Sequence, residues 1–333
     1  MKTFRNSILI ASLLAAVIPL AACDATNNNE ALSGNHPYYE NKVAETPAQQ
    51  FDSPDAAVKA LLDATQAADH PALRAMFGSE VEQLLSGDSA QDAVEFANFA
   101  KALSEMCNPV SLGEDKVVLY IGAKNWPFPI PLVRTNGKWH FDTIAGRDEI
   151  LNRRIGEDEL TAISVCRAYV AAQHDYAGVD HNGDGILSYA QRINSTPDRH
   201  DGLYWQPVEG EDLSPLGPLV ADAQQEGYDT DKPLGRTEPY HGYYFKILKA
   251  QGSDAPGGKY NYVINGNMVA GFALVAYPAH WGESGVMTFI VNQNGKVYER
   301  NLGEKSADTG AAMTEFNPGQ GWSVVAGDGA STQ

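Results

Sequence analysis

The stretch Ile130-Pro-Leu-Val-Arg-Thr-Asn-Gly-Lys-Trp-His-Phe-Asp142 places two short apolar segments on either side of the dipeptide Asn136-Gly137. Asn-Gly readily adopts the left-handed backbone conformations that a tight hairpin turn requires. The stretch therefore predicts two antiparallel strands, over residues 130–134 and 138–142. Upstream, the segment 117–121 is rich in β-branched and aromatic residues and predicts a third strand of the same sheet.

Helical patterns precede this sheet. Ser53-Pro54-Asp55 provides an N-cap, a first-turn proline and an early acidic residue, which together predict a helix start. A second short helix is expected from Asp69 to about Gly78, and a third amphipathic helix over residues 93–106. Helices packed on one face of an antiparallel sheet make an α+β domain, predicted over residues 51–178. By analogy alone, its fold is expected to resemble that of nuclear transport factor 2.

The rest of the chain divides into a connector, a second sheet and a tail. Helical spacing returns over residues 148–176, and one long helix or two in tandem is expected there. Residues 179–241 are predicted to form an irregular connector that contains one short helix, over residues 218–226. Residues 242–320 are predicted to form an antiparallel β-rich domain, with a hairpin at Asn294-Gly295, and residues 321–333 a C-terminal tail.

The charge balance restricts the class of partner. The chain contains 42 acidic and 24 basic residues and has a formal net charge of −18. Proteins that bind nucleic acid present lysine and arginine to the phosphates, so nucleic acid is excluded as a partner. Because 43% of the residues are hydrophobic, the chain has enough apolar material for packed cores.

The N-terminus has the pattern of an export signal. Residues 1–22 carry Lys2 and Arg5, then an apolar run that is too short to span a bilayer as a helix. Leu20-Ala21-Ala22-Cys23 resembles the lipobox of bacterial lipoproteins. The resemblance implies cleavage before Cys23 and acylation of this cysteine. An ordinary secretory signal and an uncleaved anchor are the alternatives.

Residues 23–50 would then be the lipidated cysteine and a disordered tether, because they show no apolar periodicity. The expected location is the cell envelope, as a membrane-anchored lipoprotein that faces the periplasm. Whether the inner or the outer membrane holds the anchor is left open.

Several distributed segments resemble one protein family. They include Trp139-His-Phe-Asp-Thr143, Asp201-Gly-Leu-Tyr-Trp205, His241-Gly-Tyr-Tyr-Phe245 and Asn265-Gly-Asn-Met268. Over about residues 50–320 the chain resembles domain of unknown function 2950, a family of exported bacterial proteins of uncharacterised activity. The resemblance implies export and supplies no catalytic residues.

The connector opens with a loop that resembles an EF-hand calcium loop. In Asp180-His-Asn-Gly-Asp-Gly-Ile-Leu-Ser-Tyr-Ala-Gln191, oxygen ligands are expected at the positions that such loops use, and glycine stands at position 6. The expected ligands are Asp180, Asn182, Asp184, Ile186 through its carbonyl, Ser188 and Gln191. The neutral Gln191 replaces the usual bidentate glutamate, so calcium is expected to bind weakly. The alternative is an ion-free turn in which the Asx side chains bond to the backbone.

The sequence offers two further candidates, a ligand cleft and a disulfide. Tyr204, Trp205, His241, Tyr243 and Trp281 could line a cleft for a glycan or a peptide, although aromatic residues in strands are more often core. Cys107 and Cys166 could form a disulfide in an oxidising compartment, or remain two buried thiols.

The resulting functional hypothesis is a lipid-anchored envelope protein that acts as a non-catalytic binding or assembly module, with an envelope protein or a glycan as partner. The common motifs of acyl-transfer enzymes, zinc proteases and dithiol oxidoreductases do not occur in the sequence. One alternative is an envelope hydrolase that uses Asp201, His241 and Glu283. Another is a pilin-like assembly subunit, which would need an unpaired apolar edge strand.

Overall fold

The computed structural model describes residues 47–208, 210, 212–230 and 235–326. All of them belong to one compact unit, Val43–Gln333. The predicted leader, Cys23 and most of the tether lie outside the described residues. The chain is packed from Gln49 onward, because the Gln49 N–H donates to the Ala75 carbonyl at 2.9 Å. No helix in the described part of the chain combines the length and apolarity that crossing a membrane requires.

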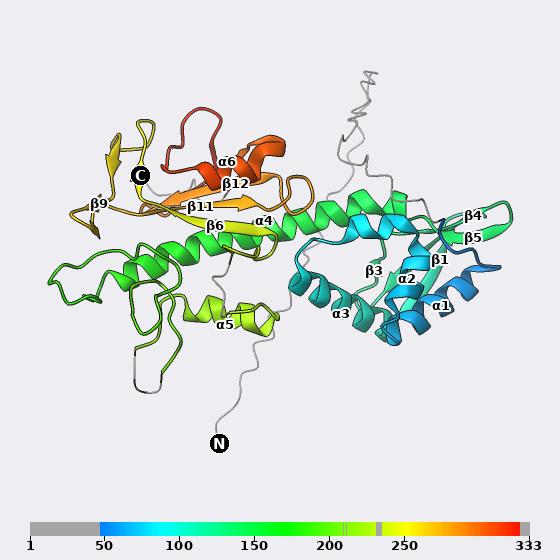
Figure 1. Cartoon of the computed structure of the whole chain (residues 1–333). Coiled ribbons are helices and arrows are strands. Elements are labelled where there is room, and N and C mark those ends of the chain that lie inside the picture. The colour runs from blue at the N-terminus through cyan, green and yellow to red at the C-terminus, as the bar shows by residue number, and fades with distance from the viewer. Residues whose placement is uncertain (1–46, 209, 211, 231–234, 327–333) are drawn as a thin grey trace. The chain divides into compact units, whose positions relative to one another are not determined.

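Three helices and a 3₁₀ turn open the fold (Figure 1). Ser53 caps the first helix as its sequence predicts, because its hydroxyl accepts the Ala56 N–H at 3.2 Å. Asp69 and Asp88 cap the next two helices in the same way. The third helix begins four residues before the predicted position 93, where Asp88 provides the cap. The elements are α1 (Pro54–Gln66), α2 (His70–Phe77), η1 (Ser79–Leu84) and α3 (Ser89–Glu105).

These helices pack on a first antiparallel sheet with the strand order β1-β2-β4-β5, in which β3 also pairs with β2. The predicted hairpin joins β4 to β5, and Asn136 and Gly137 have φ values of 52° and 80°. The first core lies between helices and sheet and includes Leu61, Leu119 and Phe141. The strands are β1 (Cys107–Ser111), β2 (Lys116–Ile121), β3 (Trp126–Pro127), β4 (Leu132–Thr135) and β5 (Lys138–Phe141).

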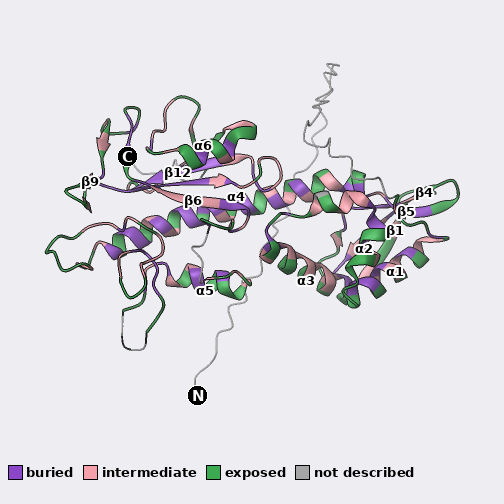
Figure 2. Ribbon diagram, viewed as in Figure 1, coloured by how far each residue is buried: buried purple, intermediate pink, exposed green. Residues whose placement is uncertain are grey.

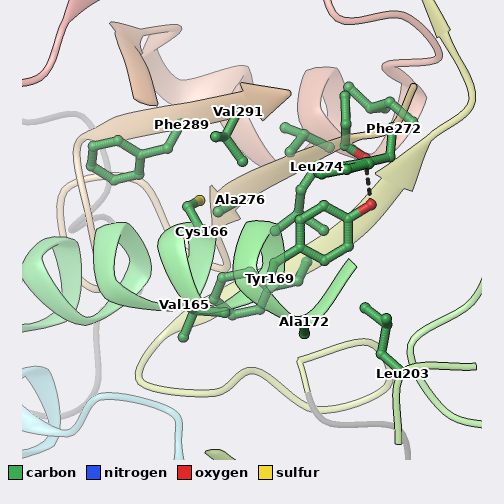
Figure 3. Close-up of a cluster of buried hydrophobic side chains, with 14 of the residues drawn as sticks. Val165, Cys166, Tyr169, Ala172, Leu203, Phe272, Leu274, Ala276, Phe289 and Val291 are labelled. Carbon is green, nitrogen blue, oxygen red and sulfur yellow. Dashed lines mark hydrogen bonds between the residues drawn. The ribbon is translucent and has the colours of Figure 1, made fainter. Parts of the chain in front are cut away.

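A single 34-residue helix, α4 (Thr143–Tyr176), follows the first sheet. Near its start, Ile150 packs against the first core, whereas residues from Ala162 to Tyr176 belong to a second core. Figure 3 shows Tyr169 of α4 beside Leu274 and Phe272, with its hydroxyl directed to the Ala273 carbonyl at 3.2 Å. The helix therefore contributes to both hydrophobic cores.

The second sheet has the order β14-β13-β12-β11-β6, and its neighbouring strands are antiparallel. The residues of its central strands β11 and β12 are almost all buried and are coloured purple in Figure 2. The helices and strands here are α5 (Gly217–Gln225), β6 (Tyr243–Leu248), β11 (Ala273–Pro278), β12 (Met287–Asn292), β13 (Val297–Asn301), η2 (Gly303–Lys305), α6 (Ser306–Ala312) and β14 (Ser323–Val324). Two short ribbons complete it: β7 (Ala250–Gln251) with β8 (Tyr260–Asn261), and β9 (Val263–Ile264) with β10 (Asn267–Met268).

The fold is thus a mixed α+β fold with antiparallel sheets, as predicted. Asn294-Gly295 lies in the connection between β12 and β13, which pair as a hairpin. The short strands β8 and β9 are separated by Tyr262, which is fully buried. The likeness of the first domain to nuclear transport factor 2 stays a prediction.

Candidate ligand-binding pocket

A polar pocket of about 1050 Å³ lies in the connector between α4 and β6. Its wall consists of the loop 194–201, residues 204–206, Val208, His181, Asn182 and Thr230. Small-molecule sites typically measure ~300 to 1000 Å³, so the pocket has room for an extended ligand. Of the five predicted cleft residues, Tyr204 and Trp205 line it.

Asp201 holds the loop 194–201 in shape. Its carboxylate accepts the Thr196 N–H at 2.7 Å and the Thr196 hydroxyl at 2.8 Å, and the Arg192 guanidinium lies 3.4 Å away. Burial raises the pKa of Asp201, but the Thr196 bonds and the Arg192 charge outweigh burial and lower this pKa overall. Asp201 is therefore an ionised structural residue whose oxygens are used within the loop.

Glycine at position 202 lets the loop close. A Cβ atom there would lie 2.7 Å from the backbone of Asn194 and Ser195, closer than real Cβ contacts come. The Gly202 N–H donates to the Ser195 hydroxyl at 3.0 Å. The sequence Asp201-Gly202 thus brings the two ends of the loop together.

Aromatic rings and imidazoles form the inner wall. The His200 ring stacks on Trp205 with centroids 4.2 Å apart and planes 17° apart. The His181 ring stacks on Tyr176 at 4.0 Å, and the Tyr176 hydroxyl donates to the His200 carbonyl at 2.8 Å. The Trp205 indole N–H donates to the Asp212 carbonyl at 3.0 Å. These contacts fix the orientation of the rings before any ligand binds.

Two buried polar atoms in the pocket wall have no hydrogen-bond partner among the described residues. They are Nε2 of His181 and Oδ1 of Asn194. Buried polar atoms are nearly always paired with protein, water or ligand, and an unpaired one costs about 1–3 kcal/mol. Two residues of the pocket wall therefore have unmet hydrogen-bonding capacity.

The structure does not bring the other predicted cleft residues to this pocket. His241 forms a 2.9 Å contact between its Nε2 and the Glu226 carboxylate. Tyr243 begins β6 with its side chain turned into the core, is fully buried and donates to the Met287 carbonyl at 2.8 Å. The Trp281 indole donates to Asn301 at 3.0 Å. Strand alternation, which turns Tyr243 inward, explains why the five residues do not share one surface.

The residues of the hydrolase hypothesis belong to separate networks. Asp201 is bonded to Thr196, His241 contacts Glu226, and the Glu283 N–H donates to the His280 carbonyl within a turn. A general acid and base must reach one reacting group. The described contacts show no such convergence of these three residues.

The EF-hand-like loop is closed by its own hydrogen bonds. The Asp180 carboxylate accepts N–H bonds from Gly183 and Gly185 at 2.8 Å, and Asp184 accepts from the amide groups of Asn182 and Asn267. Gln191 faces elsewhere: its Oε1 accepts from the Lys249 ammonium at 3.0 Å. The loop has only two carboxylates, and the described residues contain no cluster of three or more His, Cys, Asp or Glu suited to a metal.

The remaining ligand positions, Ile186 and Ser188, lie in the same segment. The Ile186 N–H donates to the Asp184 carboxylate at 2.8 Å. The side chains of Asp180 and Asp184 therefore bond to the backbone of the loop itself. At position 12, the Gln191 side-chain oxygen accepts from the Lys249 ammonium.

Cys107 and Cys166 form no disulfide in the structure. Cys107 is half-buried at the start of β1 and packs against the first core, and Cys166 is fully buried in the second core. The geometry does not pair the two thiols.

Sequence reasoning missed a buried carboxyl group, Asp158 of α4. It is fully buried, and its Oδ1 accepts from the Gln91 amide of α3 at 2.6 Å, while Oδ2 has no partner among the described residues. Burial raises the pKa of Asp158 to about 8, with a further rise from Glu95 and Glu157 that the Gln91 bond and Arg154 oppose. The signal was present in the sequence, because Asp158 lies four residues before Ala162 on the apolar stripe of the helix.

The chain is similar to a known protein family. The family model described as "Protein of unknown function (DUF2950)" matches residues 48–325, from the first packed residues to the end of the second sheet. Comparisons with curated proteins and with solved structures give no match. Because the family model covers most of the chain, this protein belongs to the DUF2950 family.

Proposed function

We propose that this protein is a lipid-anchored binding module of the cell envelope, non-catalytic, with its ligand site in the connector pocket. The observation that carries the proposal is the preformed pocket, whose rings are fixed by stacking and whose wall contains unpaired polar atoms. The lipobox-like sequence ending in Cys23, which lies outside the described residues, supports anchoring. The proposed anchor places the pocket on the periplasmic side of a membrane.

The pilin-like alternative receives no support from the described sheet edges. In the first sheet, the edge strand β1 contains Pro109. Because proline has no backbone N–H to donate, it opposes the addition of another strand at this edge. In the second sheet, the edge strand β6 is partly covered, because the Phe245 N–H donates to the Gly235 carbonyl at 2.7 Å. A binding module is therefore preferred to an assembly subunit.

Photocrosslinking in intact cells tests whether a ligand occupies the pocket. Val208 lies in the pocket wall and is 55% exposed. A benzophenone side chain introduced at position 208 is expected to form a covalent adduct with the ligand in the native envelope. The same group at Leu112, 54% exposed in the turn between β1 and β2, is the matched control and is expected to form none. Absence of a position-specific adduct at 208 by gel shift and intact mass would overturn the proposed function.

We also propose that the loop 180–191 binds calcium weakly, with a structural role. Asp180, Asn182 and Asp184 are held together by the glycine-rich turn, which supports binding, and Gln191 limits the affinity. With a Kd of ~1 mM, 10 mM calcium would stabilise the fold by about 1.4 kcal/mol and raise the melting temperature by roughly 3 °C.

The double substitution Gln191→Glu with Lys249→Met supplies a carboxylate at position 12 and removes the competing ammonium. We expect the calcium-dependent rise in melting temperature to be larger in this variant than in the wild type, and to vanish in Asp180→Ala. Calorimetry in calcium and in chelator measures both effects. Calcium binding would be contradicted if, for both the wild type and the double variant, the melting temperature were the same in calcium as in chelator.

A further inference from the structure

The strongest unexplained feature is the charge balance of the connector pocket in so acidic a protein. The pocket wall contains the charged residues Asp198, Arg199 and Asp201, and Asp201 is also offset by Arg192 at 3.4 Å. The exposed Asp198 and Arg199 are adjacent and opposite in sign. The pocket is thus close to neutral, although the chain as a whole carries −18. An anionic ligand would meet the repulsion of the whole protein, and a cationic ligand would find no uncompensated carboxylate.

The other polar groups of the wall are neutral amides and hydroxyls. Asn194, Ser195, Thr196, Gln206 and Thr230 all line the pocket. Oδ1 of Asn194 is an unpaired acceptor beneath the wall, so a ligand that brings O–H or N–H donors would satisfy it after a small side-chain adjustment. Neutral ligands rich in hydroxyl groups complement such a surface.

Stacking and hydrogen bonding hold the rings of the pocket wall in place. His200 lies against Trp205 at 4.2 Å, and Trp205 is anchored by its bond to Asp212. Tyr204 and Trp205 are only 8% and 7% exposed, so neither ring forms the open floor of an apolar recess for a peptide side chain. Peptide recognition commonly uses such a recess or a free strand edge, and the main wall here is a loop. A wall of neutral amides and hydroxyls beside a ring held by stacking suits a sugar ring better.

From these observations we propose that the connector pocket binds a neutral saccharide, with His200 presenting its ring to one sugar face. This assignment rests on the proposed function, since it names the ligand class of the same site. A peptide ligand, or a charged glycan, is an outcome of the test that would overturn it.

The test measures binding to the full mature chain in detergent by calorimetry and saturation-transfer NMR. The probes are maltotetraose and N-acetylated chitotetraose, both neutral, then deacetylated chitotetraose as cation, tetragalacturonate as anion, and tetra-alanine as peptide. We expect saturable binding of at least one neutral tetrasaccharide with a Kd of about 1 mM or below, at least tenfold tighter than any charged probe or the peptide. The neutral probe should also suppress the adduct at position 208.

His200→Ala is expected to weaken that binding at least tenfold, whereas His70→Ala, whose ring contacts Phe96 in the first domain, is expected to leave it unchanged. Unchanged melting temperatures would show that both variants fold. The saccharide assignment is overturned if a charged probe or the peptide binds more tightly than the neutral probes, or if no neutral probe binds. In that case an adduct at position 208 would still support the proposed function. Absence of that adduct defeats the proposed function itself.

Discussion

Replacement of Cys23 by serine is expected to abolish acylation of the protein. Serine cannot form the thioether that the lipobox resemblance implies, so both the diacylglyceryl group and the cleavage that follows it should be lost. Each buried methylene contributes ~0.8 kcal/mol to membrane binding, and two or more chains make the anchor effectively permanent. The effect is therefore all or none. Metabolic labelling with an alkyne fatty acid should give a labelled band for the wild type and only background for Cys23→Ser.

Cys107→Ser is the matched control, because Cys107 is a free, half-buried thiol that should carry no acyl chain. An uncleaved leader could retain the Cys23→Ser protein at the membrane, so a second form is needed, with residues 24–333 behind a cleavable secretory signal. This form should appear in the soluble periplasmic fraction. Equal labelling of Cys23→Ser and the wild type would show that the cysteine is not the anchor.

Local signals in the sequence were sufficient for the elements they specify. Ser53, Asp69 and the Asn136-Gly137 dipeptide act through bonds and backbone conformations within a few residues, and the structure confirms each of them. β1 was missed because Pro109 and polar neighbours weaken its pattern, and its pairing with β2 decides its conformation. Elements whose stability depends on a distant partner are harder to predict from one sequence.

The candidate site illustrates the same limit. Tyr204 and Trp205, two of the five residues of the predicted cleft, line the pocket. The stacking of His200 and the Asp201–Thr196 bonds arise from the course of an irregular loop. No periodic pattern encodes that course. Tyr243 belongs to the predicted cleft because of its aromatic side chain, whereas the alternation of β6 directs it into the core.

The two cores also share a polar contact that only the folded chain reveals. Asp158 of α4 accepts from Gln91 of α3, and the Tyr228 hydroxyl donates to Asp88, the N-cap of α3, at 2.8 Å. Charged groups around Asp158 include Glu95, Arg154 and Glu157, and Tyr243 of β6 lies near enough to feel its charge. A carboxyl group at this place links the first helices to α4.

Asp158→Asn is expected to stabilise the protein at neutral and alkaline pH. Burial raises the pKa of Asp158 from 3.8 to about 8, so the folded state binds this proton more tightly than the unfolded state. The stability that the protonated group contributes is complete below pH ~4 and is lost as the pH rises through about 8. At ~1.4 kcal/mol per pKa unit the loss amounts to several kcal/mol. Asparagine cannot ionise and keeps an oxygen for the Gln91 amide.

The two proteins should therefore have similar stability near pH 4, and the variant should gain steadily up to about pH 8, reaching a melting temperature higher by more than about 5 °C. Asp148→Asn is the control on the same helix, because its side chain is 78% exposed and should leave the pH profile unchanged. Denaturant unfolding between pH 4 and 9 measures the difference directly. The contrary result would be that Asp158→Asn is less stable than the wild type by the same amount at every pH. The Asp158 carboxyl group would then be ionised in the fold and paired with Arg154, and would not act as a neutral hydrogen-bonding group.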